Sequence, residues 1–136
     1  MLVRNILEES VQKFGEVKAV KWLNKKEISE RSYCEIMENA ASVRKGLLAE
    51  GFEGKHIALI GTSSVEWIES YLGIITGCTT AVPLDAALPC EDLVDLINRS
   101  DCAALFLSPK HRPYLEVFLA NCPGLQKVWM LQEEVE

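Results

Sequence analysis

The loop Gly61-Thr62-Ser63-Ser64 is the segment of this sequence best suited to bind a ligand. It stands between an apolar run typical of a strand and a predicted helix start, where backbone N–H groups and the helix dipole could hold an anion. Its residues match neither G-x-G-x-x-G nor G-x-x-x-x-G-K-[ST], the two spacings that cradle nucleotide phosphates. A tight turn followed by a helix cap needs only these residues, so the sequence favours that interpretation over a phosphate site.

A second glycine motif, Gly51-Phe52-Glu53-Gly54, has the G-x-x-G spacing of a loop that clamps an RNA backbone. Such a loop needs basic neighbours, whereas Glu50 and Glu53 are acidic. A helix stop followed by a turn into the next strand explains both glycines. The net charge of −6 and the scattered Lys and Arg residues also disfavour phosphate backbones. We therefore expect no nucleic-acid partner.

Two histidines and five cysteines are the remaining candidates for catalysis or metal binding. His56 and His111 have no partner at metal-ligand or acid–base spacing in the sequence. The cysteines are Cys34, Cys78, Cys90, Cys102 and Cys122. Their odd number and the lack of a C-x-x-C pair disfavour a disulfide framework and a zinc knuckle. We assign no catalytic, cofactor-binding or metal-binding residue and predict reduced thiols in a cytoplasmic protein.

The length and composition predict one folded unit. A chain of 136 residues with 49% hydrophobic and 25% charged residues can bury one core but hardly two. Glu8, Glu9 and Gln12 interrupt the start of the chain, so no signal peptide is predicted. The apolar runs are too short to span a bilayer, and no transmembrane segment is expected.

Four short predicted strands would help to position the candidate residues named above. Residues 57–60 form a continuous apolar run, which is typical of a central parallel strand covered on both faces. Pro83 should lie at the end of its strand, because proline cannot donate to a sheet ladder. The four predicted strands are 57–60, 79–84, 103–107 and 127–131.

Helix starts lie between these runs. Ser32-Tyr33-Cys34-Glu35 has capping-box spacing and predicts a helix that ends at Gly51. Its expected buried face is Ile36, Ala40, Val43 and Leu47. Further helix starts are predicted at Ser63-Ser64-Val65-Glu66, at Pro89 and at Ser108-Pro109. The helix after Ser63 is apolar nearly all round, which indicates burial on more than one side.

Alternation of strand and helix over residues 55–131 predicts a three-layer α/β fold with a mainly parallel sheet flanked by helices. The amino-terminal part departs from this pattern. A short helix is expected to dock through an apolar stripe, and a β-hairpin is predicted at 17–31. The stripe residues are Ile6, Leu7, Val11 and Phe14. Residues 1–136 are interpreted as a single, partial domain.

Five segments in order resemble the first part of the acyl-adenylate-forming, or AMP-binding, enzymes over about residues 6–131. They are residues 32–35, 51–59, 63–68, 81–85 and 88–89. The combination of residues 61–67 with Gly77 and Pro83-Leu84-Asp85 is most similar to the long-chain fatty acyl-CoA ligase branch. The family commonly has Asn at the place of Ser63 and a second Gly at the place of Cys78. These departures weaken the assignment to the branch.

The resemblance implies ATP-dependent conversion of a carboxylate to an acyl-adenylate, followed by transfer to coenzyme A, with magnesium required. It also implies that the phosphate-binding loop, the adenine and ribose contacts and the catalytic lysine lie beyond the position of Glu136. The chain is then an amino-terminal scaffold without a cofactor of its own, inactive alone, whose main partner is the remainder of its own enzyme chain. The alternatives are a free-standing α/β binding or interaction module and an unrelated nucleotide-binding domain that uses residues 61–64.

Truncation would also expose surface that later residues cover. The nearly all-apolar helix at 65–75 and the last strand at 127–131 are the expected exposed elements. Open strand edges and large apolar patches seek partners. We therefore expect the isolated chain to form a homodimer or a larger homo-oligomer.

Overall fold

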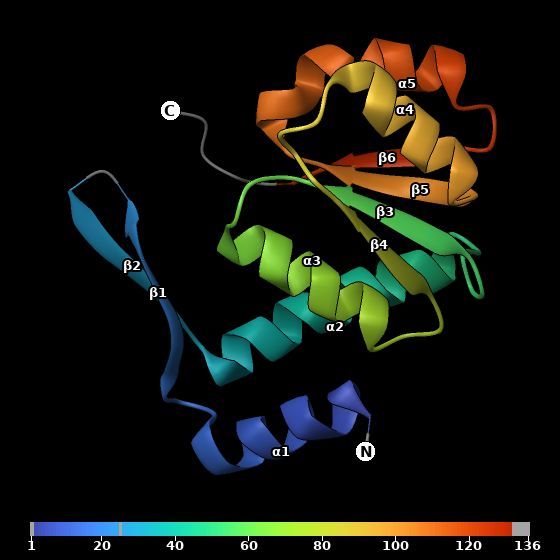
Figure 1. The fold of residues 1–136 in the computed structure, drawn as a ribbon. Helices are drawn as coiled ribbons and strands as arrows, with labels where there is room; N and C mark the ends of the chain where they lie inside the picture. Colours follow the sequence, from blue (N-terminus) through green and yellow to red (C-terminus); the bar gives the residue numbers. More distant parts are fainter. Residues whose placement is uncertain (1, 25, 132–136) are drawn as a thin grey trace.

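The computed structural model describes residues 2–24 and 26–131 and shows the predicted three-layer α/β architecture. Two helices, α2 and α3, cover one face of a four-stranded sheet, and α4 and α5 cover the other (Figure 1). The helices are α1 (Val3–Phe14), α2 (Tyr33–Ala49), α3 (Val65–Ile75), α4 (Cys90–Arg99) and α5 (Leu115–Asn121), with a 3₁₀ helix η1 (Pro109–Tyr114) before α5.

The main sheet is parallel throughout, with strand order β4-β3-β5-β6. Its strands are β3 (His56–Ile60), β4 (Thr80–Leu84), β5 (Cys102–Leu107) and β6 (Lys127–Met130). All four predicted strands are confirmed, with ends that shift by one residue. The side chains of residues 57–60 have no exposed surface, as expected for a strand covered on both faces.

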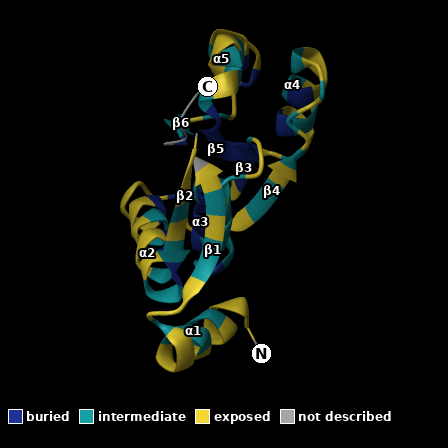
Figure 2. Ribbon diagram, turned by 90° about the vertical axis from the view of Figure 1, so that its left-hand side faces the viewer, coloured by how far each residue is buried: buried dark blue, intermediate teal, exposed yellow. Residues whose placement is uncertain are grey.

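The sheet separates two apolar clusters. Ile57 and Leu59 point toward α2 and α3, where they pack with Leu47 and Ile74. Ala58 and Ile60 point to the opposite face and pack with residues of α4 and α5, such as Ile97 and Phe118. Figure 2 shows this burial as dark blue strands at the centre of the molecule. The alternation of sides follows from the period of two along a strand.

The amino-terminal elements lie away from the main sheet. Strands β1 (Lys18–Asn24) and β2 (Glu27–Ser32) form the predicted antiparallel hairpin, which extends beside α2 and α3 (Figure 1). Helix α1 lies beneath α2 but buries none of its residues. The predicted docking through an apolar stripe is partial: the ring of Phe14 lies near that of Tyr33 in α2, with 6.3 Å between their centroids. Ile6 and Phe14 remain about half exposed.

Helix starts match the sequence only in part. Ser32 and Glu35 form the predicted capping box. The cap of α3 is Ser64, not Ser63, and Ser64 Oγ accepts a hydrogen bond from the Trp67 N–H at 3.1 Å. Pro89 is the cap of α4, one position before the predicted place. The helix expected after Ser108 begins as the 3₁₀ turn η1, because Pro113 cannot donate an α-helical hydrogen bond.

The capping box at α2 gives a pH-dependent prediction. Ser32 N–H donates to the Glu35 carboxylate at 3.1 Å, and together with the Ser32 hydroxyl it lowers the pKa of Glu35. The ionised Glu35 carboxylate stabilises the folded chain, and this contribution is fully present above the pKa that Glu35 has in the unfolded state. It is lost as the pH falls through the lower pKa that Glu35 has in the folded state. Ser32→Ala should cost about 1 kcal/mol at neutral pH. Urea unfolding of the parent, Ser32→Ala and Glu35→Gln across the acidic range would measure this, and an unchanged pH slope in Glu35→Gln would contradict it.

Candidate functional site

The direction of the chain reverses at β3, which makes the carboxyl ends of β3 and β5 the expected place for a ligand. From β3 the chain runs through α3 to β4 on one side, and then through α4 to β5 on the other side of β3 (Figure 1). In open α/β sheets, ligands bind in the crevice outside the carboxyl ends of strands at such a switch point. Gly61 follows β3 here, and Ser108 follows β5.

A cleft of about 500 Å³ lies at this edge of the sheet. It joins the loop after β3, the loop after β4 and the 3₁₀ helix after β5. Its lining residues are Gly61, Thr62, Ser63, Trp67, Leu84, Asp85, Ala86, Ala87 and His111. The structure therefore gathers residues 61–63 of the predicted loop, Leu84-Asp85 and one of the two histidines at one place.

Gly61 lies in close packing at the base of the cleft, where a side chain would press on its neighbours. A Cβ at this position would lie 3.1 Å from Leu131 Cδ1 and 3.3 Å from Ser108 Cβ. The backbone there is held by the Ser108 N–H, which donates to the Ile60 carbonyl at 2.8 Å. The glycine thus lets the ends of β3, β5 and β6 approach one another.

The cleft does not fit a triphosphate. Ser64 is engaged as the cap of α3, and the residues that line the cleft include no Lys or Arg. Asp85 adds a negative charge, and its Oδ1 accepts from the Ala87 N–H at 2.9 Å. Because tight phosphate sites need cations beside the backbone N–H groups, the described residues favour the turn-and-cap interpretation of Gly61-Thr62-Ser63-Ser64.

The two histidines lie at opposite ends of the sheet. His56 opens β3, and its Nδ1 is 2.7 Å from the Ser100 carbonyl oxygen. His111 lies at the cleft, with Nε2 2.9 Å from the Ala86 carbonyl oxygen, a contact that joins the loop after β4 to η1. Its Nδ1 is buried with no hydrogen-bond partner among the described residues. Within residues 2–24 and 26–131, no three His, Cys, Asp or Glu side chains are grouped to hold a metal ion.

The cysteine side chains differ in their exposure to solvent. Cys78 is exposed, whereas Cys102 and Cys122 are buried beside α4 and α5. Burial raises the pKa of the Cys102 thiol to about 11 and also raises the pKa of Cys122. The thiolate is the nucleophile, so these two thiols are poorly suited to catalysis.

Alkylation would test this difference. Under native conditions iodoacetamide should modify Cys78 and leave Cys102 and Cys122 intact until the chain unfolds. At neutral pH, raising a pKa from 9.0 to about 11 lowers the thiolate fraction about a hundredfold. Peptide mass spectrometry over time gives the rates, with a urea-unfolded sample as the control. Modification of Cys102 as fast as Cys78 would contradict the structure.

A second hollow, of about 610 Å³, lies between α2, α3 and the ends of β5 and β6. Its polar wall contains a charged network that the sequence analysis missed. Glu69 is 4% exposed and accepts from the Arg31 guanidinium, and its other oxygen accepts from Asn39 Nδ2 at 2.5 Å. The sequence carried a signal for it, since Glu69 stands four residues from both Val65 and Gly73 on the buried side of α3.

No helix in residues 2–24 and 26–131 combines the length and apolar character needed to cross a membrane.

Comparison with known proteins places the chain among enzymes. Residues 7–134 match the family described as AMP-binding enzyme. A CoA ligase of Gibberella moniliformis is 28% identical over 120 residues, which cover 76% of this chain and 20% of that protein. The nonribosomal peptide synthetase criC of Aspergillus cristatus is 32% identical over 78 residues, or 57% of this chain and 4% of that protein.

Solved structures share the fold of this chain. The inhibitor-bound N-terminal domain of FACL13 from Mycobacterium tuberculosis superimposes with a TM-score of 0.85 at 16% identity. The match covers 95% of this chain and 33% of that domain. The chain therefore spans a fifth of the length of its curated CoA ligase relative and about a third of that solved domain.

Proposed function

Since this chain belongs to the AMP-binding enzyme family, we propose that it is the amino-terminal scaffold of the large domain of an ATP-dependent acid–thiol ligase. The whole protein would convert a carboxylate to an acyl-adenylate and transfer the acyl group to coenzyme A. The observation that carries this proposal is the family match over residues 7–134, together with a fold shared over 95% of the chain. Residues 1–136 would be a single, partial domain.

The described residues support a scaffold role for this part of the protein. The cleft at the switch point has hydroxyls, one carboxylate and one imidazole but no cation among its lining residues. ATP, magnesium and coenzyme A would accordingly be bound by the rest of the enzyme. Within it, the chain described here would supply a rigid sheet whose carboxyl edge faces the later segments, and it would work in the cytoplasm.

The proposed acyl substrate is a long-chain fatty acid. Support comes from residues 61–67 with Gly77 and Pro83-Leu84-Asp85, which resemble that branch. A second candidate is an amino-acid-activating domain of a peptide synthetase, favoured by the similarity to criC. The acceptor distinguishes the two in the whole protein, because a CoA ligase releases acyl-CoA whereas a synthetase loads a carrier domain.

The scaffold proposal predicts no adenylation by this chain alone. Residues 1–136 with ATP, magnesium and mixed fatty acids should exchange labelled pyrophosphate into ATP no faster than a buffer blank. A preparation to which a trace of intact CoA ligase is added shows that the assay detects contamination. Exchange clearly above the blank, from protein free of such ligase, would overturn the proposal and revive Gly61-Thr62-Ser63-Ser64 as a nucleotide site.

A further inference from the structure

The β1–β2 hairpin has two different faces. Trp22 and Arg31 point inward, since the Arg31 guanidinium lies 5.7 Å from the Trp22 ring centroid and bonds Glu69 of α3. Side chains alternate between the two faces along each strand. The opposite face, called here the outer hairpin face, consists of four exposed residues: Lys21, Leu23, Ile28 and Glu30.

Two residues of the outer hairpin face are large and apolar. Leu23 and Ile28 stand directly opposite each other on the two strands. Their exposed fractions, 72% and 73%, are the highest among the large hydrophobic residues that the structure describes. The hairpin projects from the molecule with its tip clear of the helices (Figure 1). A single exposed apolar side chain is ordinary, but an adjacent pair on a projecting element indicates a surface that binds a partner.

Positive charge gathers on the same hairpin. Residues 17–31 contain five Lys or Arg against two Glu, whereas the rest of the chain contains nine Lys or Arg against eighteen acidic residues. Lys21 follows the apolar pair along the outer hairpin face, and Lys26 lies in the turn. Among the described residues, neither lysine forms an ion pair. The hairpin is thus a basic and partly apolar projection from an acidic body.

We propose that the outer hairpin face docks on an anionic lipid surface. Leu23 and Ile28 enter the boundary between headgroups and acyl chains, and Lys21 and Lys26 lie at the anionic headgroups. Stable attachment to a bilayer takes two signals, and here the apolar pair supplies one and the lysines supply the other. The same surface repels the acidic body, which orients the chain with its hairpin toward the lipid.

Charge favours this occupant over a second copy of the chain. Two outer hairpin faces packed around a two-fold axis would bring Lys21 and Lys26 of one copy close to the same residues of the other. Like charges brought together across an interface oppose association, whereas anionic headgroups complement the lysines. Docking needs neither ATP nor an acyl substrate, so it stands apart from the proposed ligase function.

Sedimentation with lipid vesicles tests the proposal. Residues 1–136 should bind phosphatidylcholine vesicles that contain about 30% phosphatidylserine at least about tenfold more tightly than vesicles of phosphatidylcholine alone. Salt at about 0.5 M should release most of the bound chain, because it screens the lysines. The double variant Leu23→Ser/Ile28→Ser should bind about tenfold more weakly or less, because it has little apolar surface to place in the lipid. Lys21→Glu should weaken binding by a similar factor, because it replaces an attraction with a repulsion.

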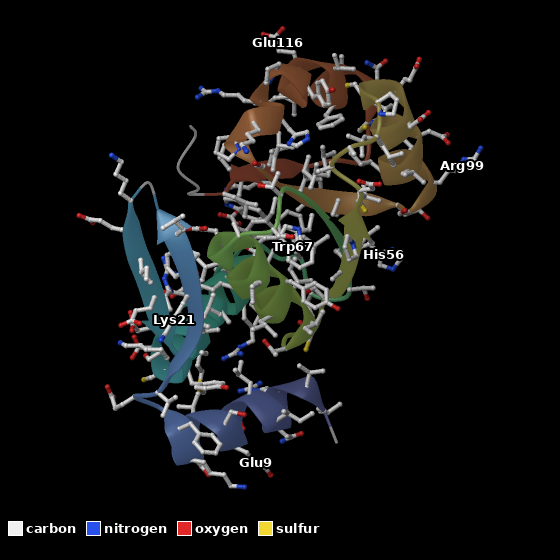
Figure 3. The ribbon with its side chains drawn as sticks, turned by 60° about the vertical axis from the view of Figure 1, so that its left-hand side comes forward. Glu9, Lys21, His56, Trp67, Arg99 and Glu116 are labelled. Atoms are coloured by element: carbon white, nitrogen blue, oxygen red, sulfur yellow. The ribbon has the colours of Figure 1, made fainter. Side chains whose placement is uncertain are left out.

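Val117→Ser/Leu119→Ser and Arg99→Glu are the matched controls. Val117 and Leu119 are exposed apolar residues of α5, and Arg99 is an exposed cation at the end of α4. Figure 3 shows Lys21 and Arg99 on opposite sides of the molecule. Each control should bind the anionic vesicles within about twofold of the parent chain, because its altered side chains lie away from the lipid.

The proposal would be overturned if the parent chain bound no vesicles, or bound neutral and anionic vesicles equally. It would also be overturned if the hairpin double-serine variant matched the α5 double-serine variant, or if Lys21→Glu matched Arg99→Glu. Light scattering after size exclusion gives a further check. A homodimer that the hairpin double-serine variant dissociates would assign the outer hairpin face to a second copy and overturn the proposal too.

Discussion

Gly73→Val is expected to prevent the chain from folding stably. A Cβ at Gly73 would lie 2.5 Å from Val43 Cβ and 2.7 Å from the Ala40 carbonyl oxygen, where α3 crosses α2. The Ala40 carbonyl belongs to the backbone and Val43 has a β-branched side chain, so neither can move aside without a large cost in free energy. Overpacking of this kind costs about 3 kcal/mol or more, a large part of the stability of a small domain.

Gly46→Ala provides the matched control. Gly46 lies inside α2, and nothing approaches within 4 Å of the position that its Cβ would take. Alanine there should stabilise the chain by about 0.5–1 kcal/mol, because it restricts the unfolded backbone and favours helix. Urea unfolding followed by circular dichroism measures both changes. Equal midpoints for Gly73→Val and the parent chain would contradict the helix contact described here.

Glu69→Ala is expected to destabilise the chain by about 3 kcal/mol, since it removes the buried acceptor of two hydrogen bonds. Arg31 and Asn39 would both lose their partner, and the hairpin would lose its charged link to α3. The side chain of Arg31 is about a quarter exposed, so water can replace part of the interaction and hold the cost near this value.

Glu66→Ala is the corresponding control on the same helix. Glu66 is more exposed and lies 3.9 Å from Arg31, so its loss should cost less than about 1 kcal/mol. Thermal or urea unfolding of the two variants gives the comparison. If Glu66→Ala proved as costly as Glu69→Ala, the buried network would not be the main link between hairpin and helix.

The fold was predictable where one residue pattern decided the structure. Residues 57–60 and 103–107 are short continuous apolar runs between predicted helices, and such runs are typical of strands covered on both faces. The capping box at Ser32 likewise fixed the start of α2. At α3, Ser63 and Ser64 each carry a hydroxyl that could cap the helix. Only the backbone geometry selects Ser64 as the cap.

The candidate site was less predictable because it depends on strand order. The Gly61 loop was identified from the sequence, but its neighbours Asp85 and His111 come from other connections and meet it only after the crossover at β3. The helix at 65–75 was expected to be exposed through its apolar residues. In the structure it buries Glu69 and Ser70 as well as Val65 and Ile74, so its hidden face is partly polar.

The single sheet between two apolar clusters has a consequence for how this chain tolerates mutation. Substitutions at Leu47 or Ile74 act on one side of the strands, and substitutions at Ile97 or Phe118 act on the other. Because the two clusters share no side chain among the described residues, their effects on the free energy of unfolding should add with little coupling. Each layer of helices can then diverge in sequence at its own pace, while the strands between them keep the same backbone.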